Sequence, residues 1–119
     1  MAMQEAVSVL RVGNLEVSLK YYTEILGFTQ DFKFKNYAGV KSGHTRLHLA
    51  GGENDHQRPI GGGTVYIFCD DVDAYYAEIK KKGATVKAEP KDYPYGMRDF
   101  IALDPDGNHL AFGCESAKA

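Results

Sequence analysis

Apolar residues recur in the same pattern in two separate stretches of the chain, and each pattern predicts a strand followed by an amphipathic helix. The runs 7–12 and 65–69 are rich in β-branched residues, which favours strands. After each run, apolar residues recur at helical spacing, at Leu15, Leu19, Tyr22 and Leu26 in the first stretch and at Val72, Tyr76 and Ile79 in the second. This self-similarity indicates an internal repeat.

Both predicted helices are bounded by residues that commonly start and stop helices. Asn14 and Asp71 stand one residue before the first apolar position, where a side-chain oxygen can accept a hydrogen bond from a free backbone N–H. Gly27 and Gly83 follow the last turns, where a residue in the left-handed conformation often ends a helix. The sequence therefore predicts one helix between these residues in each half.

Each half also ends in strands. Turn-forming residues at 104–108 (Asp-Pro-Asp-Gly-Asn) separate the apolar-rich runs Met97–Leu103 and His109–Phe112, which predicts a β-hairpin. In the first half Thr45–Ala50 alternates apolar and polar residues, and weaker strand patterns cover 28–34 and 37–40. Together these elements predict an α+β fold of two tandem βαβββ modules.

The 119 residues are expected to form a single domain of two modules, about 6–51 and 64–114, joined by the polar and glycine-rich linker 52–63. Each helix must bury its apolar stripe against the sheet, which assigns the two faces of every strand. Leu47, Leu49, Leu110 and Phe112 then lie under the helices. The opposite, concave face is expected to carry Val7, Val9, Arg11, Arg46, His48, Thr64, Tyr66, Phe68, His109 and Ala111.

The register of the predicted hairpin decides which further residues reach the concave face. If Leu103 pairs with Asn108, then Phe100 and Ala102 join that face and Arg98 lies near its rim. Tyr66 and Phe68 either fill a packed interior or offer a stacking surface to a flat ligand. The arginines and His48 make this face more polar than a core, which favours a pocket.

Composition and charge narrow the possible partners. The formal net charge is −2 with no basic stripe, so binding to nucleic acid is not expected. No apolar run is long enough to span a membrane and no signal peptide is visible, which predicts a cytoplasmic protein. Cys69 and Cys114 are far apart in the chain and too few for a disulfide framework, so both are expected to be reduced thiols.

Three segments carry a resemblance to the vicinal oxygen chelate superfamily, which includes glyoxalases, extradiol dioxygenases and bleomycin-resistance proteins. They are VLRVGNLEVSLKYYTEILGF (9–28), FCDDVDAYYAEIKKKGA (68–84) and YGMRDFIALDPDGNHLAF (95–112). The resemblance implies a cup-shaped, partly closed mixed sheet with the helices outside, and usually a homodimer in which both chains can line each pocket.

Metal-dependent members of this superfamily bind a divalent ion at the floor of the cup. The matching positions here are Val7, His48, Thr64 and Ala111. Valine and alanine have no donor atom, and a threonine hydroxyl is a poor ligand, whereas a catalytic ion usually needs about three protein ligands. We therefore expect no metal and no other cofactor, although a water-completed site between His48 and His109 is an open alternative.

The resemblance is closest to the metal-free, bleomycin-resistance-like binding proteins. We expect a protein that binds a small aromatic or anionic molecule in the cup, with antibiotic sequestration as one form of this function. The expected ligand-binding residues are Arg11, Arg46, Arg98, His48, His109, Tyr66, Phe68 and Phe100. One alternative is an enzyme, either a glyoxalase-like lyase or dioxygenase with a degenerate metal site or a metal-free enzyme that uses His48 as general base. The other is a packed cup without a ligand.

Overall fold

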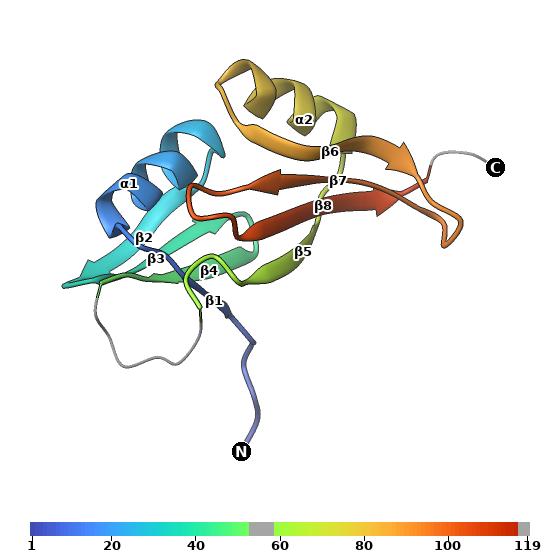
Figure 1. Ribbon diagram of the computed structural model, residues 1–119. Coiled ribbons are helices and arrows are strands. Elements are labelled where there is room, and N and C mark those ends of the chain that lie inside the picture. Colours follow the sequence, from blue (N-terminus) through green and yellow to red (C-terminus); the bar gives the residue numbers. More distant parts are fainter. Residues whose placement is uncertain (53–58, 117–119) are drawn as a thin grey trace.

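The computed structural model describes residues 1–52 and 59–116 and shows two successive modules (Figure 1). The first contains β1 (Ser8–Arg11), α1 (Leu15–Lys20), η1 (Tyr21–Ile25), β2 (Thr29–Phe34), β3 (Tyr37–Ser42) and β4 (Thr45–Ala50). The second contains β5 (Thr64–Phe68), α2 (Val72–Lys81), β6 (Thr85–Asp92), β7 (Met97–Leu103) and β8 (His109–Glu115). Residues 53–58 of the predicted linker lie outside the described residues.

The two modules have the same topology. Each forms a four-stranded sheet, in the orders β1-β4-β3-β2 and β5-β8-β7-β6. The first and last strands of each module are parallel, and the remaining neighbours are antiparallel. The prediction of two βαβββ modules is therefore confirmed, and the sheets are mixed and do not close into a barrel.

The first helix begins as predicted and ends differently. The Asn14 side chain accepts a hydrogen bond from the N–H of Val17, so Asn14 is the N-cap. The last turn, η1, is a π-helix in which the N–H of Leu26 bonds to the carbonyl of Tyr21 at 3.0 Å. Gly27 then ends the helix with a φ of +82°. The wider turn keeps the predicted stripe buried.

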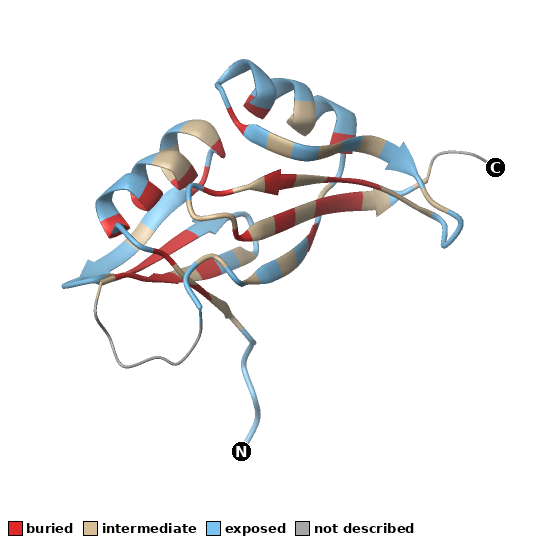
Figure 2. Cartoon of the chain, viewed as in Figure 1, coloured by how far each residue is buried: buried red, intermediate tan, exposed pale blue. Residues whose placement is uncertain are grey.

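Both helices lie on the same side of the molecule, and the core lies between them and the sheets (Figures 1 and 2). The buried strand residues on the helix side include Leu10, Leu47, Leu49, Ile67, Leu110 and Phe112. Their alternation with exposed residues follows the pleat of each strand, as the sequence predicted. We call the face of each sheet that points away from the helices its open face.

The hairpin between β7 and β8 differs from the predicted register by one residue. Leu103 pairs with His109 and not with Asn108, so Phe100 lies opposite Phe112. Asn108 is drawn into the turn and is fully buried, because its side chain accepts from the N–H of Gly63 and donates to Asp104 and to the Arg11 carbonyl. The expectation that Phe100 and Ala102 lie on the concave face is therefore wrong.

The same turn joins the two modules. The hydroxyl of Tyr22 donates to Asp104 Oδ2 at 2.9 Å, and Asp104 is itself buried. Tyr21 donates to the carbonyl of Leu103 at 2.8 Å, and from the other side Tyr75 of α2 donates to the carbonyl of Leu26 at 2.6 Å. Hydrogen bonds and apolar packing thus hold the helices of both modules together.

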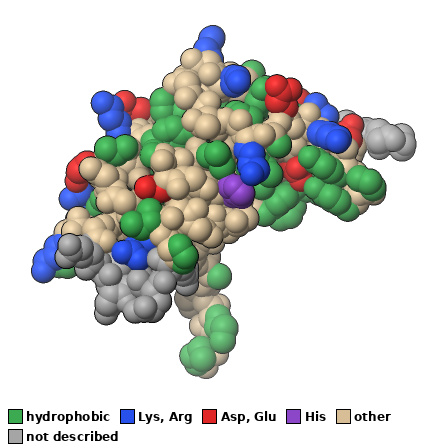
Figure 3. All heavy atoms as spheres, in the orientation of Figure 1, with side chains coloured by type: hydrophobic (Ala, Val, Ile, Leu, Met, Phe, Trp, Pro, Cys, Tyr) green, Lys and Arg blue, Asp and Glu red, His purple; other side chains and the backbone are tan. Residues whose placement is uncertain are grey.

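No helix among the described residues is long and apolar enough to cross a membrane. Figure 3 shows lysine and arginine side chains interspersed with acidic ones on the face that it displays. Several charged side chains of the protein form ion pairs, and those of Arg46 and Arg98 bear on the candidate site.

Candidate functional site

The open face of the first sheet carries a cluster of three rings, from Phe32, Tyr37 and His48. The Tyr37 hydroxyl and His48 Nδ1 are hydrogen-bonded at 3.0 Å. The Phe32 ring meets the His48 ring edge to face with 5.1 Å between centroids. Phe32 also lies flat over Gly39, where a Cβ atom would collide with the ring. A glycine in the middle strand therefore lets this cluster lie against the sheet.

The open face of the second sheet carries an aromatic pair backed by a carboxylate. The rings of Tyr66 and Phe68 are 5.3 Å apart between centroids, and the Phe68 side chain is 75% exposed. Behind them Asp99 is only 6% exposed, and its Oδ2 accepts hydrogen bonds from Tyr66 at 2.9 Å and from Tyr95 at 2.8 Å. Again a glycine makes room, because a Cβ at Gly113 would collide with the Tyr66 hydroxyl.

The two tyrosines that contact Asp99 are held in their neutral form. Burial and the hydrogen bond to Asp99 both raise the pKa of Tyr66, with burial the larger cause. The same two causes, in the same order, raise the pKa of Tyr95. Both hydroxyls therefore remain donors to Asp99, and they orient the Tyr66 ring beside the exposed Phe68.

The arginines predicted to bind an anion already have partners. On the first sheet, Arg46 lies 3.2 Å from Asp31 Oδ2 and 3.6 Å from Glu5 Oε2. Arg11 donates from Nη2 to the carbonyl of Gly52 at 3.2 Å. Because these guanidinium groups are engaged within the chain, they offer less attraction to an anionic ligand than the sequence suggested.

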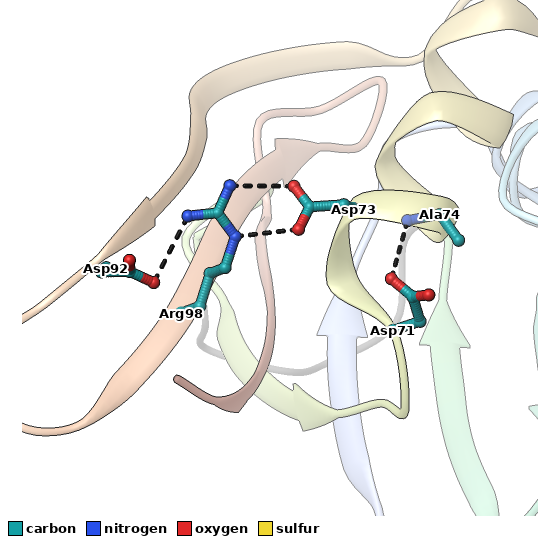
Figure 4. Close-up of polar contacts among 5 residues, drawn as sticks. All are labelled: Asp71, Asp73, Ala74, Asp92 and Arg98. Carbon is teal, nitrogen blue, oxygen red and sulfur yellow. Dashed lines mark hydrogen bonds and ion pairs between the residues drawn. The ribbon is translucent and has the colours of Figure 1, made fainter. Parts of the chain in front are cut away.

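Arg98 lies on the helix side of its sheet, which corrects the expectation that it lines the rim of the concave face. The corrected register places it opposite Cys114 and on the same face as Phe100. Its guanidinium makes two 2.9 Å hydrogen bonds to Asp73, in the first turn of α2, and one of 3.3 Å to Asp92 (Figure 4). Arg98 therefore joins α2 to strands β6 and β7.

The two remaining predicted residues, Phe100 and His109, lie on opposite faces of the second sheet. Phe100 is fully buried and stacks on Phe112, so it belongs to the core and not to a ligand surface. His109 lies on the open face of the second sheet, opposite Thr64 and Leu103. Among the predicted ligand-binding residues, the open face of the second sheet carries Tyr66, Phe68 and His109. The open face of the first sheet carries Arg11, Arg46 and His48.

Two neighbouring hollows lie where the first module meets β5. One, of about 300 Å³, borders Arg46 on β4 and Tyr66 and Phe68 on β5. The other, of about 520 Å³, extends towards α2 and is floored by apolar residues that include Phe28 and Phe112. Both are lined by His44, Thr45, Ile67 and Phe68. The exposed ring of Phe68 thus borders both hollows, and the larger of them is a cleft of a size that suits a small molecule.

The positions that match metal ligands do not form a metal centre in the part of the chain that the structure describes. No group of three or more His, Cys, Asp or Glu side chains there is arranged to share an ion. His48 lies in the first sheet, bonded to Tyr37, and His109 lies in the second. What this arrangement offers chemically is aromatic surface with hydroxyl and imidazole hydrogen-bonding groups.

Sequence reasoning missed Phe32, Tyr37, Asp99 and Tyr95. Asp99 belongs to the strand whose register differs by one residue from the prediction, and it alternates with Phe100, which was expected on the concave face. Phe32 follows a bulge between Gln30 and Phe32, which breaks the alternation that assigns faces. The signal that would have found Asp99 is the correct pairing of Leu103 with His109.

Comparisons with known proteins agree with this geometry. The sequence model of the Glyoxalase/Bleomycin resistance protein/Dioxygenase superfamily matches residues 5–112. A bleomycin resistance protein of Geobacillus stearothermophilus is 26% identical, over 92% of this chain and 96% of its own. A lactoylglutathione lyase of Neisseria meningitidis is 29% identical, over 88% of this chain and 86% of its own. Among solved structures, TnmS3, an antibiotic-binding protein from Streptomyces sp. CB03234, superposes with a TM-score of 0.81 at 26% identity, covering 98% of this chain and 99% of that one.

Proposed function

Because the chain belongs to the Glyoxalase/Bleomycin resistance protein/Dioxygenase superfamily, we propose that it binds a small organic molecule with a flat aromatic part, without metal and without turnover. The observation that carries the proposal is the exposed Phe68 ring beside Tyr66, which Asp99 holds in place. Relatives named for bleomycin resistance and for antibiotic binding support an antibiotic as the ligand class.

Stacking on Phe68 and Tyr66 would contribute favourably to the binding free energy. Exposure of the phenylalanine ring to water is unfavourable in the free protein. A flat aromatic ligand that covers the ring removes this apolar surface from water and adds a favourable ring–ring contact. Of the two expected ligand properties, aromatic or anionic, the proposal therefore keeps the aromatic one. The anionic part is not favoured, because Arg46 and Arg98 are paired with carboxylates.

We further propose that two copies complete the site. The ring cluster of the first sheet and that of the second lie on separate open faces, and each leaves aromatic rings exposed, with Phe32 at 38% and Tyr66 at 40%. The radius of gyration is 14.7 Å, which exceeds the value of about 13.5 Å for a compact chain of this length. The single chain is therefore more extended than a typical compact domain. In a homodimer, the first open face of one copy would cover the second open face of its partner.

The lactoylglutathione lyase relative supports a second candidate, an enzyme of the same fold. The substitutions in this chain argue against it. Two of the positions that match metal ligands are Val7 and Ala111, which cannot bind a metal, and a third is Thr64, whose neutral hydroxyl is a poor ligand. A catalytic divalent ion would lack the ligand set that such sites need.

The proposal is tested by titrating the purified protein with bleomycin and with a panel of planar aromatic compounds while ligand-dependent thermal stabilisation is measured. For a ligand that binds, Phe68→Ala should raise Kd about tenfold. The matched control is Val17→Ala, which removes an exposed apolar side chain from α1 and should leave Kd unchanged. Equal Kd values for Phe68→Ala and the parent would reject the stacking site.

Elemental analysis of the same preparation tests the metal-free part of the proposal. Less than a tenth of an ion per chain, roughly, would agree with it, because a functional site is occupied near one to one. One tightly held divalent ion per chain would reject it and favour the enzyme.

A further inference from the structure

Cys69 and Cys114 are far apart in the sequence and lie side by side in the second sheet. Strands β5 and β8 are parallel with Phe68 opposite Gly113, so the next residues along are Cys69 and Cys114. The N–H of Cys69 bonds to the carbonyl of Gly113 at 2.9 Å, which continues the ladder and places Cys69 directly opposite Cys114. The sequence spacing alone gave no sign of this pairing.

The two thiols also share one face of the sheet. Side chains alternate along a strand, so Cys69 points the same way as Ile67, and Cys114 the same way as Phe112. Both cysteines pack against the core that these residues form. Neighbouring strands are about 4.8 Å apart, and the Cα atoms of a disulfide are usually about 4.4–6.8 Å apart. The backbone therefore holds the pair within bonding range.

We propose that Cys69 and Cys114 form a reversible intramolecular disulfide, which is a redox modification site of this protein. In the structure both are free thiols. Cys69 lines the 520 Å³ cleft, and both residues are partly exposed, so a small oxidant can reach them. Burial and the nearby Cys114, Asp70 and Asp71 raise the pKa of the Cys69 thiol, which agrees with the closeness of the two sulfur atoms.

The oxidant that fits is a low-molecular-weight disulfide such as glutathione disulfide. One cysteine thiolate attacks it, forms a mixed disulfide and releases one molecule of glutathione as thiolate. The second cysteine loses its proton and attacks the protein-side sulfur, which releases the second glutathione. The two cysteines are oxidised by two electrons in all, and the small disulfide is reduced to two thiols.

The position of the pair predicts a bond that is easily reduced. Directly opposite residues on parallel strands hold their Cβ atoms about as far apart as the strands themselves, near 4.8 Å, whereas disulfides favour about 3.8 Å. Strained disulfides are reduced more readily than structural ones. Cys69 follows the last residue of β5, where a small backbone shift can bring the sulfur atoms together.

The experiment incubates the reduced, folded protein with glutathione mixtures of increasing disulfide content, blocks free thiols by alkylation, and measures intact mass. We expect a product with the mass of a single chain minus two hydrogens, with neither cysteine alkylated and no glutathione attached. Excess reduced glutathione should return this product to the dithiol. Strain lowers the equilibrium constant for formation of the disulfide, but the sheet raises the effective concentration of the second thiol by more, so the constant should still be at least tenfold higher in the folded protein than in urea.

The matched controls are Cys69→Ser and Cys114→Ser, each of which should accumulate a one-glutathione adduct that does not resolve. If the parent protein accumulates such adducts like the single variants, or forms disulfides between chains, the proposal is wrong. An equilibrium constant no higher in the folded protein than in urea would also overturn it.

Discussion

The hydroxyl of Tyr22, in the first module, donates a 2.9 Å hydrogen bond to Asp104 in the last hairpin of the second. Both residues are buried, and Asp104 also accepts from the backbone N–H groups of Asp106 and Asn108. The carboxylate thus organises its own turn and receives a donor from a helix 82 residues away in sequence. Folding of the hairpin turn and packing of the two modules are therefore coupled.

Replacing Tyr22 with phenylalanine should lower the free energy of unfolding by about 2 kcal/mol, because a buried carboxylate oxygen loses a donor. Urea-induced unfolding measures this change. Tyr76→Phe is the matched control, since Tyr76 packs its ring on Phe100 and its hydroxyl makes no hydrogen bond within residues 1–52 and 59–116. A loss of the same size in both variants would mean that the Tyr22–Asp104 bond contributes nothing specific.

Alkaline pH should destabilise the protein through its buried tyrosines. Burial raises the pKa of Tyr22 and Tyr75 above the ordinary value of 10.0, with nearby Asp104 adding to the effect at Tyr22. The folded state then keeps these protons while the unfolded chain releases them. The resulting stability is complete below pH 10 and is lost as pH rises above it, by about 1.4 kcal/mol per pH unit for each such tyrosine.

The measurement for this prediction is the free energy of unfolding between pH 9 and 11.5, roughly the range in which an unfolded tyrosine ionises. The Tyr75→Phe variant should show a shallower decline than the parent, because one proton fewer is released on unfolding. Parallel declines in the two proteins would contradict the assignment.

The two modules were predicted well because helix caps and apolar stripes depend on residues close together in the sequence. Each helix starts at its capping residue, Asn14 or Asp71, and its apolar stripe packs on the strands that precede and follow it. The hairpin register was wrong because Asn108 is held by partners distant in sequence, the N–H of Gly63 and the carbonyl of Arg11. An asparagine next to Asp-Gly fits the end of a strand and the end of a turn equally well.

The candidate site was only partly predictable for the same reason. Tyr66 and Phe68 lie on a strand with strict alternation, so their face follows from the neighbouring buried residue Ile67. Arg98 was placed at the rim of the concave face, but it pairs with Asp73 from α2, 25 residues away. Pairing between long polar side chains depends on the relative position of whole elements, which a strand pattern does not contain.

The Arg98–Asp73 pair should matter for stability and not for ligand binding. Asp73→Asn removes the charge but keeps the side-chain size, and it should lower Tm slightly, because the pair is exposed to solvent. The hydrogen bonds from Arg98 lower the pKa of Asp73, so its contribution should be lost as pH falls through the acidic range. Calorimetry of Asp73→Asn and the parent checks both points, and a change in ligand Kd would contradict the assignment.

Gly113→Ala should disturb the aromatic site from beneath. A Cβ at position 113 would collide with the Tyr66 hydroxyl, so Tyr66 must leave Asp99 or the strands must move apart. Overpacking of this kind typically costs about 1–3 kcal/mol. Gly62→Ala is the control, because a Cβ there meets only ordinary contacts with Pro59, the nearest at 3.4 Å.

A double-mutant cycle separates the collision with Tyr66 from a general effect on β8. If the Tyr66 ring is the cause, Gly113→Ala should cost much less in a Tyr66→Ala background than in the parent, because the space above the strand is then empty. Equal costs in both backgrounds would place the strain elsewhere in the strand. A coupling of at least about 1 kcal/mol would show that Gly113 is required because Tyr66 lies against it, and that the position of the stacking surface depends on a residue that no ligand touches.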